Sequence, residues 1–195
     1  MLYYTDKRLP GEQELRGLLS DKKTQLWLIS GANRVALSDG LINAIVDAYE
    51  QGRGIYIWGD NDPWFSDANA ILRRIYNTTM FGDTPGGKNI SIQTRAGQPG
   101  IIANHAIGTG IINFYEGVTI ATIDCKGNLR PLVYGSACNI VTAYDDSNKR
   151  RLLADGGFTR LYVDTDKAGT ERYVVNAAVW LANLERIGFR SLPKF

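Results

Sequence analysis

Several features that mark specialised chemistry are scarce in this sequence. Its 195 residues include two cysteines and one histidine. Two cysteines exclude a disulfide framework and a zinc site made of four thiolates. Lysine and arginine number 22 against 20 acidic residues, and a net charge of +2 does not support a polybasic surface for nucleic acid or membranes. We therefore expect partners other than nucleic acid or a lipid bilayer.

Long apolar segments are also missing. The longest stretch without a formal charge lies between Arg95 and Glu116, and its proline, asparagines and glycines would make a poor membrane span. The first residues lead into three charged side chains at 6–8 and do not resemble a signal peptide. We therefore expect a cytoplasmic protein in which Cys125 and Cys138 are free thiols.

What the sequence does contain is the composition of an ordinary folded domain. Apolar residues make up 44% and charged residues 22%, which is enough for a sizeable core. The length is close to the usual allowance of about 150 residues per domain. No internal repeat, low-complexity tract or linker interrupts the chain. The expectation is a single α/β domain that spans residues 1–195.

Apolar runs and helical patterns alternate through the first half of the chain. Gln25–Ser30 and Gly54–Trp58 have the length and flanking turns of buried strands. Ser38 is suited to cap a helix that ends before Gly52, and the pair Asp62-Pro63 is suited to begin the next helix. Strands and helices that alternate at this spacing predict right-handed βαβ units and a parallel sheet.

The second half is richer in short β-type runs separated by turn residues. Residues 77–110 are rich in Gly, Thr, Asn and Pro and give only a weak strand signal. Hairpins are predicted from the runs VTIATI, PLVYG, IVTAY and RLLADGG. A last helix begins near Thr170 and carries, at helical spacing, Tyr173, Ala177, Leu181 and Leu184. The patterns predict a three-layer domain with a mostly parallel sheet that includes Arg151–Asp155, and with β-hairpins added in the C-terminal half.

The strongest functional signal follows the Gly54–Trp58 run. After a turn glycine come Asp60, Asn61, Asp62 and Trp64, immediately before the predicted helix. In open α/β sheets, ligands bind beyond the carboxyl ends of the strands, where helix N-termini offer free N–H groups. We therefore expect these four side chains to bind a ligand. A turn and a helix cap would use the same residue types, so a structural role stays open.

His105, the only histidine, is the second candidate. An imidazole titrates near neutrality and could act as a general base or bind a ligand. Catalysis would also need a nucleophile and an orienting carboxylate, which Glu116 or Asp60 could supply, so the catalytic candidates are His105, Asp60 and Glu116. Cys125 and Cys138 lie in turns without a helix N-terminus to activate them. A structural role for His105 in its glycine-rich segment also stays open.

The order of these elements resembles the class I glutamine amidotransferase-like superfamily, especially its trehalose-utilisation-type and related branches. The matching segments lie within residues 25–185 and include QLWLIS, RGIYIWGDNDPW, NHAIGTGIINFYEG and LLADGGFTRLY. The resemblance implies a flavodoxin-like or amidotransferase-like sheet and a site in which His105 lies beside the strand ends. In that superfamily the turn after a strand carries a nucleophilic cysteine. Here the turn reads Gly59-Asp60-Asn61-Asp62, and Ala106 stands where proline is frequent.

The missing thiol leads to the first functional hypothesis. Without a cysteine or serine at the turn there is no acyl-enzyme route, so we expect no glutaminase activity. The chain would instead be a non-catalytic amidotransferase-like domain that needs no cofactor. It would bind a small molecule or a protein partner through the loops around Asp60–Trp64 and His105. Asp60, Asn61 and His105 would then share one cleft, and a carboxylate about 4–6 Å from the imidazole would raise its pKa.

Two alternatives belong to other functional classes. One is a metal-assisted hydrolase or phosphatase, because Asp60 and Asp62 after an apolar strand resemble the opening motif of haloacid-dehalogenase-type phosphatases. Magnesium prefers carboxylate oxygens, and Asp145–Asp146 or Asp155 could complete its ligand set. The other is an assembly or scaffold domain, in which exposed strands of the second half pair edge to edge in a homo-oligomer.

Overall fold

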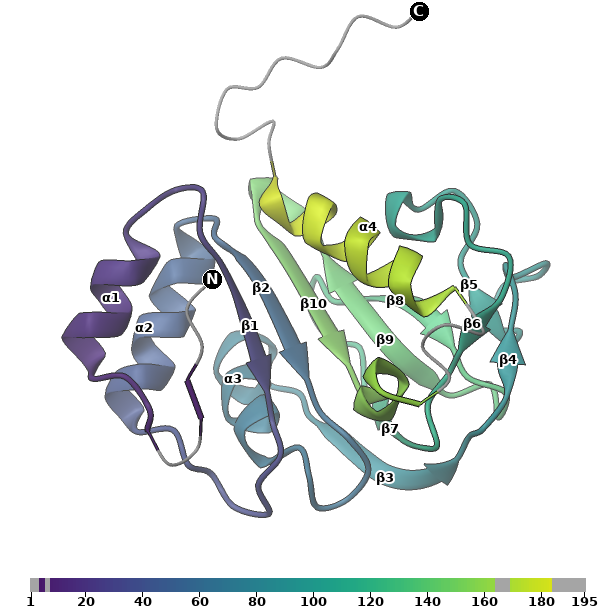
Figure 1. Ribbon diagram of the computed structural model, residues 1–195, viewed down its shortest axis with the longest axis horizontal. Coiled ribbons are helices and arrows are strands. Elements are labelled where there is room, and N and C mark those ends of the chain that lie inside the picture. Colours follow the sequence, from purple (N-terminus) through teal and green to yellow (C-terminus); the bar gives the residue numbers. More distant parts are fainter. Residues whose placement is uncertain (1–3, 6–7, 164–168, 184–195) are drawn as a thin grey trace, which may run out of the picture.

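A six-stranded mixed sheet forms the centre of the computed structural model, which describes residues 4–5, 8–163 and 169–183 (Figure 1). Its strand order is β1-β2-β10-β9-β8-β5. The strands are β1 (Gln25–Ile29), β2 (Gly54–Trp58), β10 (Arg151–Asp155), β9 (Ile140–Asp145), β8 (Arg130–Tyr134) and β5 (Gly100–Ile101). The three strands predicted to be parallel, β1, β2 and β10, are parallel neighbours. From β10 to β5 every pairing is antiparallel, so only half of this sheet is parallel.

Helices cover both faces of the sheet and give the three predicted layers (Figure 1). They are α1 (Glu12–Leu19), α2 (Asp39–Glu50), α3 (Ser66–Tyr76) and α4 (Thr170–Ala182). Successive strand residues point to opposite faces. Ile55 and Ile57 of β2 therefore pack in the core formed with α1, α2 and α3, while Tyr56 and Trp58 pack in the core under α4. Leu184, predicted for the last helix, lies outside the described residues.

The ends of α2 follow the predicted chemistry, but the start of α3 does not. The Ser38 hydroxyl accepts the Leu41 N–H at 3.3 Å, and Gly52 follows the helix with a φ of 82°, where a side chain would be strained. The helix α3 begins at Ser66, so Asp62-Pro63 does not begin it. The peptide bond of that pair is cis, and the Asp62 N–H donates to the Gly82 carbonyl of the strand β3 (Met80–Pro85) at 3.0 Å. Residues 62 and 63 therefore belong to a loop that is hydrogen-bonded to β3, and not to α3.

The second half contains the predicted hairpins with one exception. The pairs β8–β9 and β9–β10 are antiparallel neighbours, as expected. The run VTIATI forms β7 (Thr119–Ile123), which pairs with β3 and not with β8. A further small pair joins β4 (Asn89–Ile90) to β6 (Phe114–Tyr115). Residues 77–110, which gave little strand signal, thus supply β3, β4 and β5, because their partners lie far along the chain.

The edge at β5 bears on the homo-oligomer hypothesis. Gly100 and Ile101 are buried, and the Ile101 N–H donates to the Ser91 carbonyl while the Ile101 carbonyl accepts from the Gln93 N–H. Residues 91–93 thus cover this edge, which leaves few backbone groups for a second chain. Homo-oligomer formation stays a prediction, but this edge gives it no support. Within the described part of the chain, no helix is both long enough and apolar enough to cross a bilayer.

Candidate functional site

The segment after β2 lies where the sequence predicted, at the carboxyl end of an inner strand. The Gly59 N–H donates to the Asp155 carbonyl at 2.8 Å, and the Gly59 carbonyl accepts from the Phe158 N–H at 3.2 Å. A β-carbon at Gly59 would collide with the Met80 sulfur and would lie 3.0 Å from the Phe65 β-carbon. A side chain at this turn would therefore require Met80 to shift, and the turn brings the loops after β2 and β10 into contact. The structure therefore confirms a tight turn at this point of the chain.

The polar side chains of this turn lie at the surface. Asp60 is half-buried and its carboxylate accepts the Asn61 N–H at 3.0 Å, while Asp62 and Trp64 are exposed. The Asn61 amide donates to the Asp62 carbonyl at 3.1 Å. Burial raises the pKa of Asp60, and the Asn61 N–H and Arg160 offset only part of this effect. Asp60, Asn61, Asp62 and Trp64 thus form one loop surface, in part through bonds to each other.

Below this loop lies a buried ion pair that the sequence reasoning missed. Asp155 and Arg160 are both completely buried, and the guanidinium contacts both carboxylate oxygens. Arg160 also donates to the carbonyls of Tyr115 at 3.1 Å and Glu116 at 2.7 Å. The Tyr56 hydroxyl lies 3.1 Å from the Asp155 carboxylate. We call Asp155, Arg160, Tyr56 and Tyr173 the buried network.

Hydrogen bonds within the buried network satisfy its two charged groups. The Tyr173 hydroxyl donates to Asp155 at 3.0 Å and lies 2.9 Å from the Tyr56 hydroxyl. Burial raises the pKa of both tyrosines, so the phenols keep their protons and act as donors. A Gly-Gly pair directly after the buried strand at Asp155 was a usable sequence signal for a tight turn. Arg160 itself gave no signal, because its partner is defined only by the folded chain.

Glu116 is buried and holds two loops together. Its carboxylate accepts the Lys88 N–H at 3.1 Å, the Ser136 N–H at 2.6 Å and the Ser136 hydroxyl at 2.7 Å. These contacts are unrelated to His105, so the structure does not support Glu116 as an orienting carboxylate for the imidazole. Glu116 instead fixes the loop before β4 against the turn between β8 and β9.

The structure separates His105 from Asp60, contrary to the predicted shared cleft. The imidazole packs against the rings of Tyr144 and Trp180, with centroids 4.4 and 5.5 Å away. Tyr144 is the register partner of Leu153, and the Trp180 carbonyl accepts from Arg151 at the start of β10. His105 thus lies toward the amino end of β10, whereas Asp60 lies beyond its carboxyl end. Five residues of strand, at about 3.3 Å each, set the distance between these ends.

The electrostatics of His105 differ from the prediction for the same reason. Burial lowers its pKa to about 4; Asp146 opposes this effect, while Arg151 and Arg130 add to it. Its Nδ1 accepts the Ile107 N–H at 3.2 Å, which places the remaining proton on Nε2. The expected rise in the pKa was wrong, because the carboxylate meant to cause it lies elsewhere. A neutral imidazole packed between rings is typical of a structural residue.

The carboxylates proposed for magnesium are dispersed. Asp155 belongs to the buried network, Asp146 pairs with Arg130, and Asp145 accepts the hydroxyls of Tyr49 and Tyr76. Among the residues that the structure describes, no group of three or more His, Cys, Asp or Glu side chains could hold a metal ion. A ligand set around Asp60 and Asp62 is therefore not formed by the side chains predicted for it.

Comparison with known proteins identifies the fold but no family. No family model and no curated protein matches the sequence. The structure is similar to the mmIFT52 N-terminal domain, with a TM-score of 0.65 and 13% identity over 93% of this chain and 83% of that chain. It is also similar to a cytoplasmic protein of Salmonella typhimurium, STM3548, with a TM-score of 0.64 and 7% identity over 90% and 76% of the two chains. At such identities the likeness concerns the fold alone.

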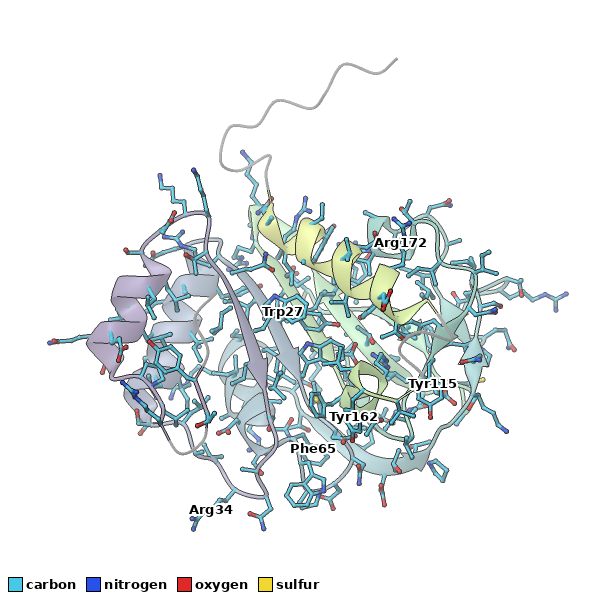
Figure 2. All side chains as sticks on the ribbon, in the orientation of Figure 1. Trp27, Arg34, Phe65, Tyr115, Tyr162 and Arg172 are labelled. Carbon is cyan, nitrogen blue, oxygen red and sulfur yellow. The ribbon has the colours of Figure 1, made fainter. Side chains whose placement is uncertain are left out.

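Exposed apolar side chains occur on the segments that adjoin these strand ends. We call them the carboxyl-end surface: Ile29, Val35, Trp64, Phe81, Val118 and Tyr162. Backbone bonds connect the segments that carry them, as between Asp62 and Gly82 and between Gly59 and Phe158. Figure 2 shows the neighbouring Arg34 and Phe65 below the ends of β1 and β2, with Tyr162 close to the end of β10. Cavities of about 380 and 350 Å³ lie elsewhere and are not lined by Asp60, Trp64 or Phe81.

Proposed function

We propose that this chain is a non-catalytic, amidotransferase-like domain of the cytoplasm that holds a protein partner through its carboxyl-end surface. The observation that carries the proposal is the exposure of large apolar side chains at this surface. Trp64 is 42% exposed, Phe81 50% and Tyr162 64%. Contiguous exposed apolar patches mark interaction sites, and aromatic anchors supply much of the binding energy in protein interfaces.

The interior beneath the surface supports binding over chemistry. An enzyme of this layout would place reactive groups in a crevice at the strand ends. Here Arg160 and Asp155 neutralise each other in a closed interior, and the turn residue Asp60 is no thiol or hydroxyl nucleophile. We therefore expect no ammonia release from glutamine, and an activity lost in Asp60→Ala would contradict the proposal.

Charge at the surface indicates the kind of partner. Asp60, Asp62 and Asp83 lie near Trp64 and Phe81, and the carboxylate of Asp83 acts on the pKa of Asp60. None of these three carboxylates has an ion-pair partner among the described side chains. A partner segment with apolar side chains and lysine or arginine would complement both features.

Site-specific crosslinking in the native cell tests the proposal. A photoreactive benzoylphenylalanine replaces Trp64 in one variant and, as the matched control, Val179 of α4, which is 60% exposed. We expect a discrete covalent adduct with one protein from position 64 and none from position 179. Phe81→Glu in the same chain should abolish the adduct. Equal crosslinking from both positions, or an adduct that survives Phe81→Glu, would show that the surface is not the binding site.

A further inference from the structure

A cavity of about 380 Å³ opens at the other end of the molecule, where α2 and α3 end and β10 begins. Arg73 and Arg74 come from the last turn of α3, and Arg150 immediately precedes β10. We call this space the guanidinium cavity. It shares no lining residue with the carboxyl-end surface.

The three guanidinium groups keep spare hydrogen-bond donors. Arg150 pairs with Glu50, yet its Nε is buried and has no acceptor in the described structure. Arg74 donates to the amide oxygen of Asn43 at 3.2 Å. Within the described ranges no carboxylate lies within ion-pair distance of Arg73 or Arg74. The buried Nε of Arg150 is closed to a ligand, so the donors that the cavity offers are those of the exposed Arg73 and Arg74.

Two carboxylates line the cavity: Glu50 pairs with Arg150, whereas Asp145 is bound by other groups. Asp145 accepts the Tyr49 hydroxyl at 2.5 Å, the Tyr76 hydroxyl at 2.8 Å and the Ser147 N–H at 2.7 Å. Burial would raise the pKa of Asp145, but these hydrogen bonds outweigh it and lower the pKa. Burial also raises the pKa of Tyr49 and Tyr76, so both phenols stay donors. The charge of Asp145 is thus satisfied by its own neighbours.

Basic residues in the last turn of a helix compensate the helix dipole, and this accounts for Arg73 and Arg74 being on α3. Arg150 belongs to another segment and lines the same space, where it pairs with Glu50 and lies over the Tyr49 ring. We propose that the guanidinium cavity binds the phosphoryl group of a small phosphomonoester. Guanidinium forks match phosphate oxygens in charge and geometry.

The size of the cavity indicates more than a bare phosphate ion. Small-molecule sites usually enclose about 300–1,000 Å³ and combine apolar walls with a few polar groups. Ile75 and the rings of Tyr49 and Tyr76 line the cavity beside the arginines. The ligand class that fits is therefore a phosphomonoester with an apolar or aromatic portion.

Calorimetric titration with phenyl phosphate, at low ionic strength, tests the assignment. We expect saturable binding with a Kd of about 1 mM or tighter, and weaker binding of inorganic phosphate and of benzoate. The double variant Arg73→Gln/Arg74→Gln, changed only at exposed positions, should bind at least about tenfold more weakly. Arg130→Gln, which removes an exposed arginine outside the cavity, should bind as the unchanged chain does.

Three results would overturn the proposal. The first is no saturation at about 10 mM phenyl phosphate, which corresponds to negligible affinity. The second is equal binding by the unchanged chain and the double variant, when circular dichroism shows that both are folded. The third is a phosphotyrosine pentapeptide that binds more tightly than phenyl phosphate, which would assign the cavity to a phosphorylated protein segment. The carboxyl-end crosslink is independent of all three.

Discussion

The two ends of β10 treat charge in opposite ways. At the carboxyl end, the buried Arg160 and Asp155 neutralise each other, and two tyrosine hydroxyls complete the shell. At the amino end, Arg150 pairs with Glu50, whereas the exposed Arg73 and Arg74 have no ion-pair partner among the described residues and line an open cavity. A buried charge needs an oppositely charged or hydrogen-bonding partner within the chain, because it has lost its hydration. A charge that faces water is hydrated and stays available to a ligand. The carboxyl end of β10, where the sequence predicted a functional site, thus has a closed interior. The amino end, for which the sequence predicted no site, has an open cavity.

The largest effect should come from breaking the buried pair. Arg160→Met leaves the Asp155 carboxylate buried without its cation, and we expect a loss of about 3–5 kcal/mol in the free energy of unfolding. Urea unfolding at neutral pH measures it. The matched control is Arg130→Met, whose pair with Asp146 is exposed and should contribute about 0–1 kcal/mol.

A second variant keeps this prediction informative if Arg160→Met fails to fold. Asp155→Leu/Arg160→Met removes both charges and should be more stable than Arg160→Met, since no ion is left uncompensated. Equal losses in Arg160→Met and Arg130→Met would mean that burial does not distinguish the two ion pairs.

A smaller effect is expected at the amino end, where Tyr76→Phe removes one donor from Asp145. The loss should be about 1–3 kcal/mol at pH 7. The lowered pKa of Asp145 gives stability that is present above its ordinary value of 3.8 and is lost as the pH falls through the folded-state pKa. The difference between Tyr76→Phe and the unchanged chain should therefore shrink below pH 3.8.

Urea unfolding across this pH range provides the measurement. Tyr134→Phe is the control, because the Tyr134 side chain forms no hydrogen bond within the described part of the chain. A Tyr76→Phe loss that is independent of pH would argue against the carboxylate as the acceptor that matters.

The smallest effect should be that of the Asp60 charge on the pKa of His105. NMR titration of the single imidazole should give a pKa of about 4, since burial disfavours the cation. Asp60→Asn should change this pKa by less than about 0.3 units, because Asp60 is not among the charges that act on His105 and interactions between charges are screened over about 10 Å. Asp146→Asn should lower it, since Asp146 favours the protonated ring.

The same titration predicts how stability depends on pH. Because folding lowers the pKa of His105 from 6.5, its contribution is complete above pH 6.5 and declines as the pH falls toward 4. His105→Gln should remove this decline. A pKa of His105 above 6.5 that falls in Asp60→Asn would instead show that Asp60 and His105 share one cleft, as the sequence predicted.

The sequence by itself determined the elements whose signals are local. Gln25–Ile29 and Gly54–Trp58 are strands because short apolar runs lie between turns, and α2 begins and ends at its predicted cap residues. The missing thiol after β2 could likewise be read directly. These features depend on neighbours a few residues away, so the linear pattern contains them.

The tertiary structure decided which distant residues meet. The partner of β7, the position of His105 and the pair between Asp155 and Arg160 depend on how loops return to the sheet. The same chain return brings Arg150 to the end of α3. Pairing between distant residues follows from topology and burial rather than from sequence periodicity. A buried charge is stable only beside an opposite charge, and the fold decides which residue lies there.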